Sequence, residues 1–105
     1  MYLVHAHVEM PGPLEVPPDI GELARTLLRA DPRAQVEHLA VHRRSAHVFT
    51  LGFFILADHW ELASEHAAEV CGRMLTEPPL QRARLLSTGA PPVGPAFDGQ
   101  WRWDP

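Results

Sequence analysis

Histidine offers the most chemistry in this chain, and four of its seven copies fall into two evenly spaced pairs. His5 and His7 are separated by a single residue. His38 and His42 lie four positions apart. Even spacings place side chains on one face of an extended strand, because successive side chains point to opposite faces. An imidazole titrates near neutral pH and can transfer protons or bind a metal. The sequence therefore predicts two strands that each present a pair of imidazoles on one face.

These strands belong to a predicted set of four. Tyr2 to Glu9 alternates between apolar and polar residues, which is typical of a strand with two different faces. We expect the second and third strands over Val36 to Arg43 and Val48 to Ala57. The third is apolar on both faces and rich in β-branched and aromatic residues, which indicates burial on both sides. A short last strand is expected over Arg84 to Thr88, although Leu80 to Leu86 would also suit a helical turn.

Two amphipathic helices are expected between these strands. One begins after Asp19 and ends at Asp31, and the other begins after Asp58 and ends before Pro78. Asp19 and Asp58 each precede a glutamate by three positions, the spacing of a capping box. At helical spacing the apolar stripes comprise Ile20, Leu23, Ala24, Leu27 and Leu28, and then Ala63, Ala67, Val70, Cys71 and Met74. Cys71 is thus expected to be a small buried hydrophobe rather than a nucleophile.

The order βαββαβ with two such helices predicts an α+β fold of ferredoxin-like type, with both helices on one face of an antiparallel sheet. In element order and burial pattern, over nearly its whole length, the chain resembles the dimeric α+β barrel superfamily of small proteins. We expect one domain over residues 1–95 and a C-terminal tail over 96–105. The resemblance implies ligands held between two sheets, as in cofactor-independent oxygenases, isomerases, cyclases and haem-handling proteins.

The burial pattern by itself also predicts a homodimer. Two helices cover one face of the sheet, which would leave Val48, Phe54 and Leu56 of the third strand exposed on the other. Exposed apolar patches of this kind usually mark an interface. A twofold copy presenting the same face would bury the patch around an interior space. Tail aromatics offer a competing cover, which would leave a monomer with a lidded cleft. They are Phe97, Trp101 and Trp103.

The register of the middle hairpin decides which residues line that space. A three-residue loop starting at Arg44 would put His38 opposite Gly52 and Ala40 opposite Thr50. A four-residue loop would exchange the two faces. We favour the odd register because it pairs Leu39 with Leu51 and Val41 with Phe49 under the helices, and Gly52 then leaves room for a small pocket. The predicted pocket comprises the candidate catalytic residues His5, His7 and His38, with Glu9, Ala40, His42, Thr50, Gly52 and Phe54 around them.

Three functions would use such a pocket. The favoured hypothesis is a homodimer that binds an apolar or aromatic organic molecule, with one of His5, His7 and His38 transferring a proton, in bacterial specialised metabolism. The alternative is a non-catalytic binding or accessory protein that holds a small molecule or a partner protein. The third is a metal site: His5 and His7 lie roughly 7 Å apart along a strand. A third ligand to zinc would come from His38, or else from His42 or Glu9. We expect no cofactor, and the sequence does not decide whether the protein is an enzyme.

Composition disfavours several other classes. The net charge is −4 and no basic run is longer than Arg43-Arg44, which argues against binding to nucleic acid. No apolar stretch is long enough to span a membrane, and no signal peptide is recognised. A single cysteine allows no intrachain disulfide. We therefore expect a cytoplasmic protein without a membrane partner. All nine basic residues are arginine, which indicates a GC-rich bacterial genome.

Overall fold

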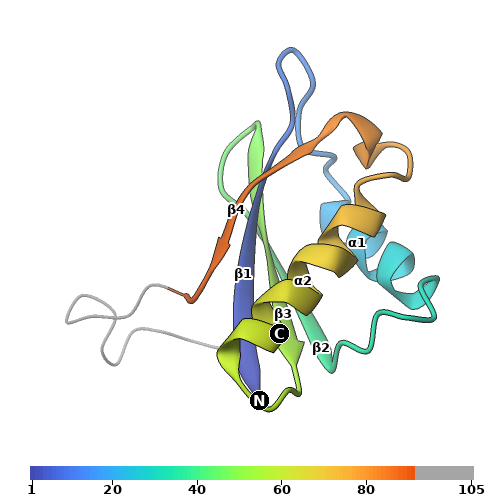
Figure 1. Ribbon diagram of the computed structural model, residues 1–105. Helices are drawn as coiled ribbons and strands as arrows, with labels where there is room; N and C mark the ends of the chain where they lie inside the picture. The colour runs from blue at the N-terminus through green and yellow to red at the C-terminus, as the bar shows by residue number, and fades with distance from the viewer. Residues whose placement is uncertain (92–105) are drawn as a thin grey trace.

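The structure is a computed structural model that describes residues 1–91. Two helices cover one face of a four-stranded antiparallel sheet (Figure 1). The elements in chain order are β1 (Tyr2–Glu9), α1 (Ile20–Arg29), β2 (His38–Arg43), β3 (Val48–Ile55), α2 (Trp60–Met74), a 3-10 turn (Leu80–Arg82) and β4 (Arg84–Gly89). Across the sheet the strands are ordered β2-β3-β1-β4. This is the predicted ferredoxin-like α+β arrangement.

The core lies between the sheet and the helices. Alternate residues of β1 and β3 point to this side, and the apolar stripe of α2 packs against them. The fully buried members are Val4, Ala6 and Val8 of β1, Phe49, Leu51 and Phe53 of β3, and Ala63, Ala67, Val70 and Cys71 of α2. Burial raises the pKa of the Cys71 thiol to about 12. Cys71 is therefore a protonated core residue, as predicted.

The helix starts depend less on capping than the sequence indicated. α1 begins directly after Asp19, but the Asp19 side chain makes no capping hydrogen bond. α2 begins at Trp60, so its N-cap is His59 and the predicted cap at Asp58 is wrong. The Glu61 side chain lies 3.1 Å from His59 Nδ1 instead of returning to the backbone. Burial of the apolar stripes, rather than capping, therefore positions both helices.

The register between β2 and β3 differs by two residues from the predicted one. Ala40, and not His38, lies opposite Gly52, and His38 lies opposite Phe54. The turn is displaced because the Arg44 amide still donates to a carbonyl of β3, at 2.9 Å, so the loop starts one residue later. A shift of two residues keeps each side chain on its original face. The predicted faces are therefore right and the predicted pairing is wrong.

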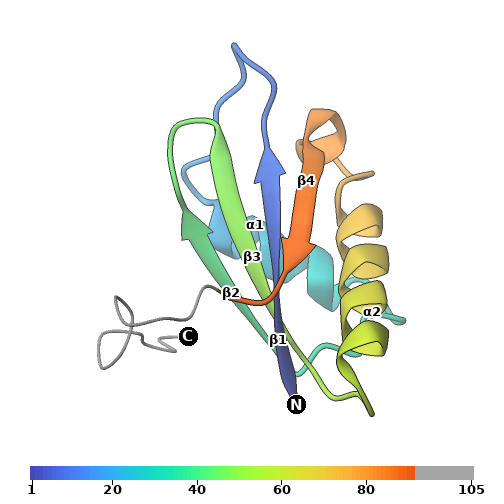
Figure 2. The ribbon, with the colours of Figure 1, turned by 60° about the vertical axis from the view of Figure 1, so that its left-hand side comes forward.

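The sheet face opposite the helices is called the open face here. Figure 2 shows the four strands side by side with no helix in front of them. The open face carries Leu3, His5, His7 and Glu9 of β1, Val48, Thr50, Gly52 and Phe54 of β3, and His38, Ala40 and His42 of β2. The predicted tail and its aromatic residues Phe97, Trp101 and Trp103 lie outside the described residues. Within residues 1–91, neither helix combines the length and the apolar character that crossing a membrane requires.

Candidate functional site

A polar row crosses the open face from β1 to β2. His7 pairs with Thr50 of β3, which in turn pairs with His42 of β2. The buried Thr50 hydroxyl lies 2.9 Å from His7 Nδ1, and Arg44 Nε donates to it at 3.1 Å. A hydroxyl can accept from Arg44 and donate its own proton to His7 Nδ1. With that assignment the neutral His7 ring carries its proton on Nε2.

His5 is the least satisfied group on the open face. Its side chain is 6% exposed, and Nδ1 is the one buried side-chain nitrogen or oxygen in residues 1–91 without a hydrogen-bond partner. Burial first, and then the positive charges of His7, Arg44 and His42, lower the pKa of His5 from 6.5 to about 4. His5 is therefore neutral at pH 7. Because buried polar atoms in proteins are normally paired, its Nδ1 marks a place where a partner is expected.

Gly52 lies directly opposite His5 and lets its neighbours converge over the middle strand. A methyl group at Gly52 would lie 3.3 Å from Leu3 Cδ1, 3.5 Å from Ala40 Cβ and 3.6 Å from His5 Cδ2. These three groups thus occupy much of the room that we expected above the glycine. A ligand on this face must therefore lie on top of Leu3, Ala40 and His5 rather than between the strands.

The apolar end of the open face borders a pocket of about 510 Å³. Leu3 and Phe54 pair there and form one wall. Tyr2 and Trp60 form another, with their rings edge to face and their centroids 6.1 Å apart. The remaining lining residues are Met1, Ala90 and Pro91. Apolar and aromatic walls of this kind suit an apolar or aromatic organic group.

The structure brings two of the three candidate histidines together. The rings of His5 and His7 are nearly perpendicular, with centroids 6.0 Å apart. His38 lies apart from them at the apolar end, where its ring is 5.4 Å from that of Phe54. Glu9 lies at the opposite, polar end, where its Oε1 accepts hydrogen bonds from Arg84 at 2.9 and 3.0 Å. The charge of Glu9 is therefore already paired.

The sequence does not predict two residues of the candidate site, one on the open face and one at the apolar pocket beside it. Arg44 was assigned to the loop, although it continues the even-numbered series of β2 residues and so falls on the same face as His42. The even number of Arg44 is a usable signal if the second strand is extended by one residue. Trp60 begins α2 and reaches the apolar pocket from outside the sheet. No spacing rule connects Trp60 with Leu3, so the sequence held no signal for it.

The metal hypothesis lacks its third ligand. No group of three or more histidine, cysteine, aspartate or glutamate side chains is placed to hold a metal ion within residues 1–91. The register keeps His38 away from His5 and His7, because Ala40 lies opposite Gly52 where His38 is expected. His5 and His7 remain as a pair without a further ligand among the described residues.

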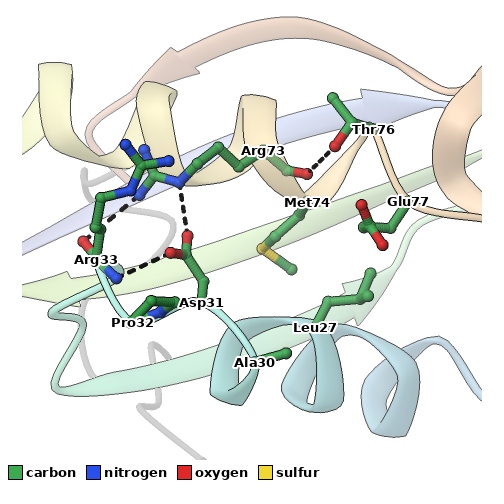
Figure 3. Close-up of a pocket in the computed structure, with 9 residues that line it drawn as sticks. All are labelled: Leu27, Ala30, Asp31, Pro32, Arg33, Arg73, Met74, Thr76 and Glu77. Atoms are coloured by element: carbon green, nitrogen blue, oxygen red, sulfur yellow. Dashed lines mark hydrogen bonds and ion pairs between the residues drawn. The ribbon is translucent and has the colours of Figure 1, made fainter.

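A second pocket, of about 520 Å³, lies on the helix side between the C-terminal ends of α1 and α2 (Figure 3). Arg73 Nε donates to Asp31 Oδ2 at 2.7 Å, and the Arg33 amide donates to Asp31 Oδ1 at 2.9 Å. These hydrogen bonds, that of Arg73 first, lower the pKa of the Asp31 carboxyl. Asp31 and Arg73 satisfy each other, so we assign this cluster to holding the loop after α1 against α2.

Comparison with known proteins adds no functional assignment. No protein-family model matches the chain, and no curated protein or solved structure matches it either. The ferredoxin-like fold by itself is compatible with many unrelated functions. A function must therefore be inferred from the chemistry of the open face.

Proposed function

We propose that the protein is a homodimer that binds an apolar or aromatic organic molecule on the open face, with His5 and His7 available for proton transfer. The observation that carries the proposal is the buried, unpartnered His5 Nδ1 beside an apolar surface. A ring flip of His5 would exchange Nδ1 with Cδ2, the atom that lies above Gly52. A ligand resting on this face would then supply the missing hydrogen-bond partner.

Self-association would complete the site. The helices cover one face of the sheet, and the open face keeps Leu3, Val48 and Phe54 only half-buried. A copy that presents the same face would bury these side chains by twofold symmetry. The imidazoles of both copies would then face one shared chamber, from which most water is excluded. This is the arrangement that the resemblance to dimeric α+β barrels implies.

Proton transfer would use a neutral imidazole beside an apolar ligand. At pH 7 His5 is neutral, and His7 is held by Thr50 next to it. This chemistry is of the general acid–base kind that cofactor-free isomerases, cyclases and oxygenases require. The composition favours a place for this chemistry in the cytoplasm of a bacterium, in specialised metabolism.

A second candidate function is binding without turnover. The pKa of His5, about 4, makes it a weak base at neutral pH, whereas efficient general bases have a pKa near the working pH. This observation favours an accessory protein that holds a small molecule or a partner. The substitution His5→Gln separates the two functions, because glutamine keeps hydrogen-bonding capacity and cannot transfer a proton at neutral pH. Metabolite profiles of producing cells should change with His5→Gln if the protein is catalytic, and stay the same if it only binds.

Self-association and ligand binding are tested together on the full chain. Sedimentation at micromolar concentration should show a dimer, and amide NMR signals of Leu3, Gly52 and Phe54 should shift when 2-naphthol is added. Leu3→Asp should give a monomer, because it places a carboxylate in the interface. Leu62→Asp is the matched control, since Leu62 is an exposed leucine of α2. A monomeric wild-type protein without shifts on the open face would overturn the proposal.

A further inference from the structure

We infer that the ligand is an organic acid, whose carboxylate binds at Arg44 and His42 and whose apolar part extends over Gly52 towards Leu3. This inference rests on the proposed function, because it names the class of ligand that the same face would take. It follows from three properties of the open face: its polarity changes from one end to the other, the guanidinium of Arg44 makes no ion pair in residues 1–91, and its dimensions match a small aromatic acid.

The polarity of the open face changes along the strands. Leu3 and Phe54 form the row at one end, beside the apolar pocket. Two rows further along, Thr50 lies between His7 and His42, and Arg44 donates to its hydroxyl. A molecule lying along the strands would therefore contact apolar side chains at one end and hydrogen-bond donors at the other. This pattern fits an amphipathic ligand with a polar group at one end.

The polar end carries positive charge without a compensating carboxylate. Arg44 makes no ion pair in residues 1–91, and the one hydrogen bond of its side chain there runs from Nε to the Thr50 hydroxyl. Its two terminal nitrogens thus remain available, in the geometry that binds a carboxylate with two parallel hydrogen bonds. The His42 side chain is exposed and makes no hydrogen bond within the described chain. Burial and His7 are the main causes of the lowered pKa of His5, and Arg44 and His42 add to it from the same end of the face.

Glu9 does not neutralise this charge. It is the one carboxylate among the described strand residues of the open face, and it lies at the same polar end. Both hydrogen bonds to its Oε1 come from Arg84, a residue of β4. Glu9 and Arg84 therefore form a closed pair, and the guanidinium of Arg44 is left for an anion from outside the described chain.

The spacing of the rows limits the size of the ligand. Thr50 and Gly52 are two residues apart on β3, which corresponds to roughly 7 Å, and Thr50 and Phe54 are roughly 13 Å apart. A carboxylate at Arg44 would thus place a two-ring aromatic system above Gly52, with its far edge near Leu3. A lone inorganic anion would leave this apolar surface uncovered. We therefore assign the site to a carboxylate with an attached apolar body.

The test compares an acid with its neutral isostere on the full-length protein. Binding of 2-naphthoate, 2-naphthamide and acetate is measured by calorimetry at pH 7 and low ionic strength. Wild-type protein should bind 2-naphthoate about tenfold more tightly than 2-naphthamide, the size expected for a charge-assisted hydrogen bond at a partly exposed site. Acetate should bind much more weakly than 2-naphthoate, because it covers no apolar surface.

Substitutions locate the preference for the acid. Arg44→Gln should bring the two affinities to within about twofold of each other, with little change in the affinity for 2-naphthamide. Arg43→Gln is the matched control: it removes the same charge from the neighbouring residue, which belongs to the opposite face of β2. His42→Gln is a second test at an exposed position, and it should reduce the preference even if Arg44→Gln does not fold.

The outcomes separate this inference from the proposed function. Equal binding of 2-naphthoate and 2-naphthamide by the wild-type protein would overturn the organic acid and leave the apolar ligand standing. Absence of binding by both compounds would overturn both proposals. An equal loss of preference in Arg43→Gln and Arg44→Gln would show that net charge alone is responsible, which also overturns the carboxylate site.

Discussion

On β3, residues that point to the helices differ in kind from the residues between them. Phe49, Leu51 and Phe53 face the helices and are fully buried apolar side chains. Thr50 and Gly52 alternate with them and face the open side. One strand thus carries a packed core on one face and a mixed polar and apolar surface on the other. The comparison indicates that the residues of the core and the residues of the proposed site lie on opposite faces of the same sheet.

The buried polar groups follow the same division. Among residues 1–91, the buried polar or charged residues are His5 and Thr50, and both lie on the open face. A buried polar side chain without a partner is destabilising, so His5 is not explained by stability alone. On the helix side, by contrast, the Asp31 carboxylate accepts a hydrogen bond from Arg73. The one unsatisfied buried side-chain atom in residues 1–91 therefore lies on the face where we propose that a ligand binds.

The largest change in the free energy of unfolding should come from substituting two adjacent phenylalanines that point to opposite faces. Phe53→Ala removes a fully buried ring from the core and should lower the free energy of unfolding by about 3–5 kcal/mol. Phe54→Ala removes a half-buried ring from the open face and should cost about 1–2 kcal/mol. Urea denaturation measures both values on the same strand, one residue apart.

Measuring the stability losses of Phe53→Ala and Phe54→Ala at several protein concentrations distinguishes the two faces further. If a second copy covers the open face, the loss for Phe54→Ala should grow with protein concentration, because association stabilises the folded state by mass action. The loss for Phe53→Ala should grow much less, since its contacts lie within one chain. Equal losses for the two variants at every concentration would contradict a functional difference between the faces.

The next largest effect should be the pH dependence of the free energy of unfolding that His5 causes. In the unfolded chain His5 takes up a proton near pH 6.5, but in the folded protein only near pH 4. Between these values the unfolded state binds more protons, so the free energy of unfolding falls as the pH drops. We expect a loss of about 1–2 kcal/mol from pH 7 to pH 4, because solvent screens part of the effect on the open face.

Substitution isolates this contribution. His5→Leu should remove the part of the pH dependence that lies between pH 6.5 and pH 4, as measured by urea denaturation at several pH values. Asp31 acts in a different range, because its pKa is lowered by Arg73 and its contribution is lost only as the pH falls below 3.8. Parallel curves for wild-type protein and His5→Leu from pH 7 to pH 4 would show that His5 is not held neutral by its surroundings.

The same division explains what the sequence could predict. Apolar stripes at helical spacing and alternation in β1 fix which faces are buried, and these predictions are confirmed by Ala63 and Val70 in α2 and Val4 in β1. The pairing of β2 with β3 could not be fixed in this way. Registers two residues apart put the same side chains on the same faces, so Leu39 is equally buried in either. The hydrogen bonds of the turn at Arg44 decide between them.

The candidate site was predictable only in part for the same reason. Face assignment correctly placed His5 and His7 together, because it depends on spacing within one strand. The position of His38 depends on pairing between strands, and the structure places it opposite Phe54 instead. Leu3 and His5 of β1 and Ala40 of β2 come together over Gly52 of β3, which no local pattern describes. Contacts between distant residues are therefore the part that the sequence leaves open.

The smallest effect should come from the ion pairs on the two sides of the sheet. Arg84→Gln breaks the pair with Glu9, in which the arginine side chain is 74% exposed. Exposed pairs typically contribute about 0.2–1 kcal/mol, so the free energy of unfolding should change by no more than that. Arg73→Gln breaks the more buried pair with Asp31 and leaves a carboxylate that is 12% exposed. It should therefore cost clearly more, and salt should reduce the Arg84 effect more than the Arg73 effect. A greater loss for Arg84→Gln would place a stabilising interaction on the open face and contradict the division of roles between the two faces.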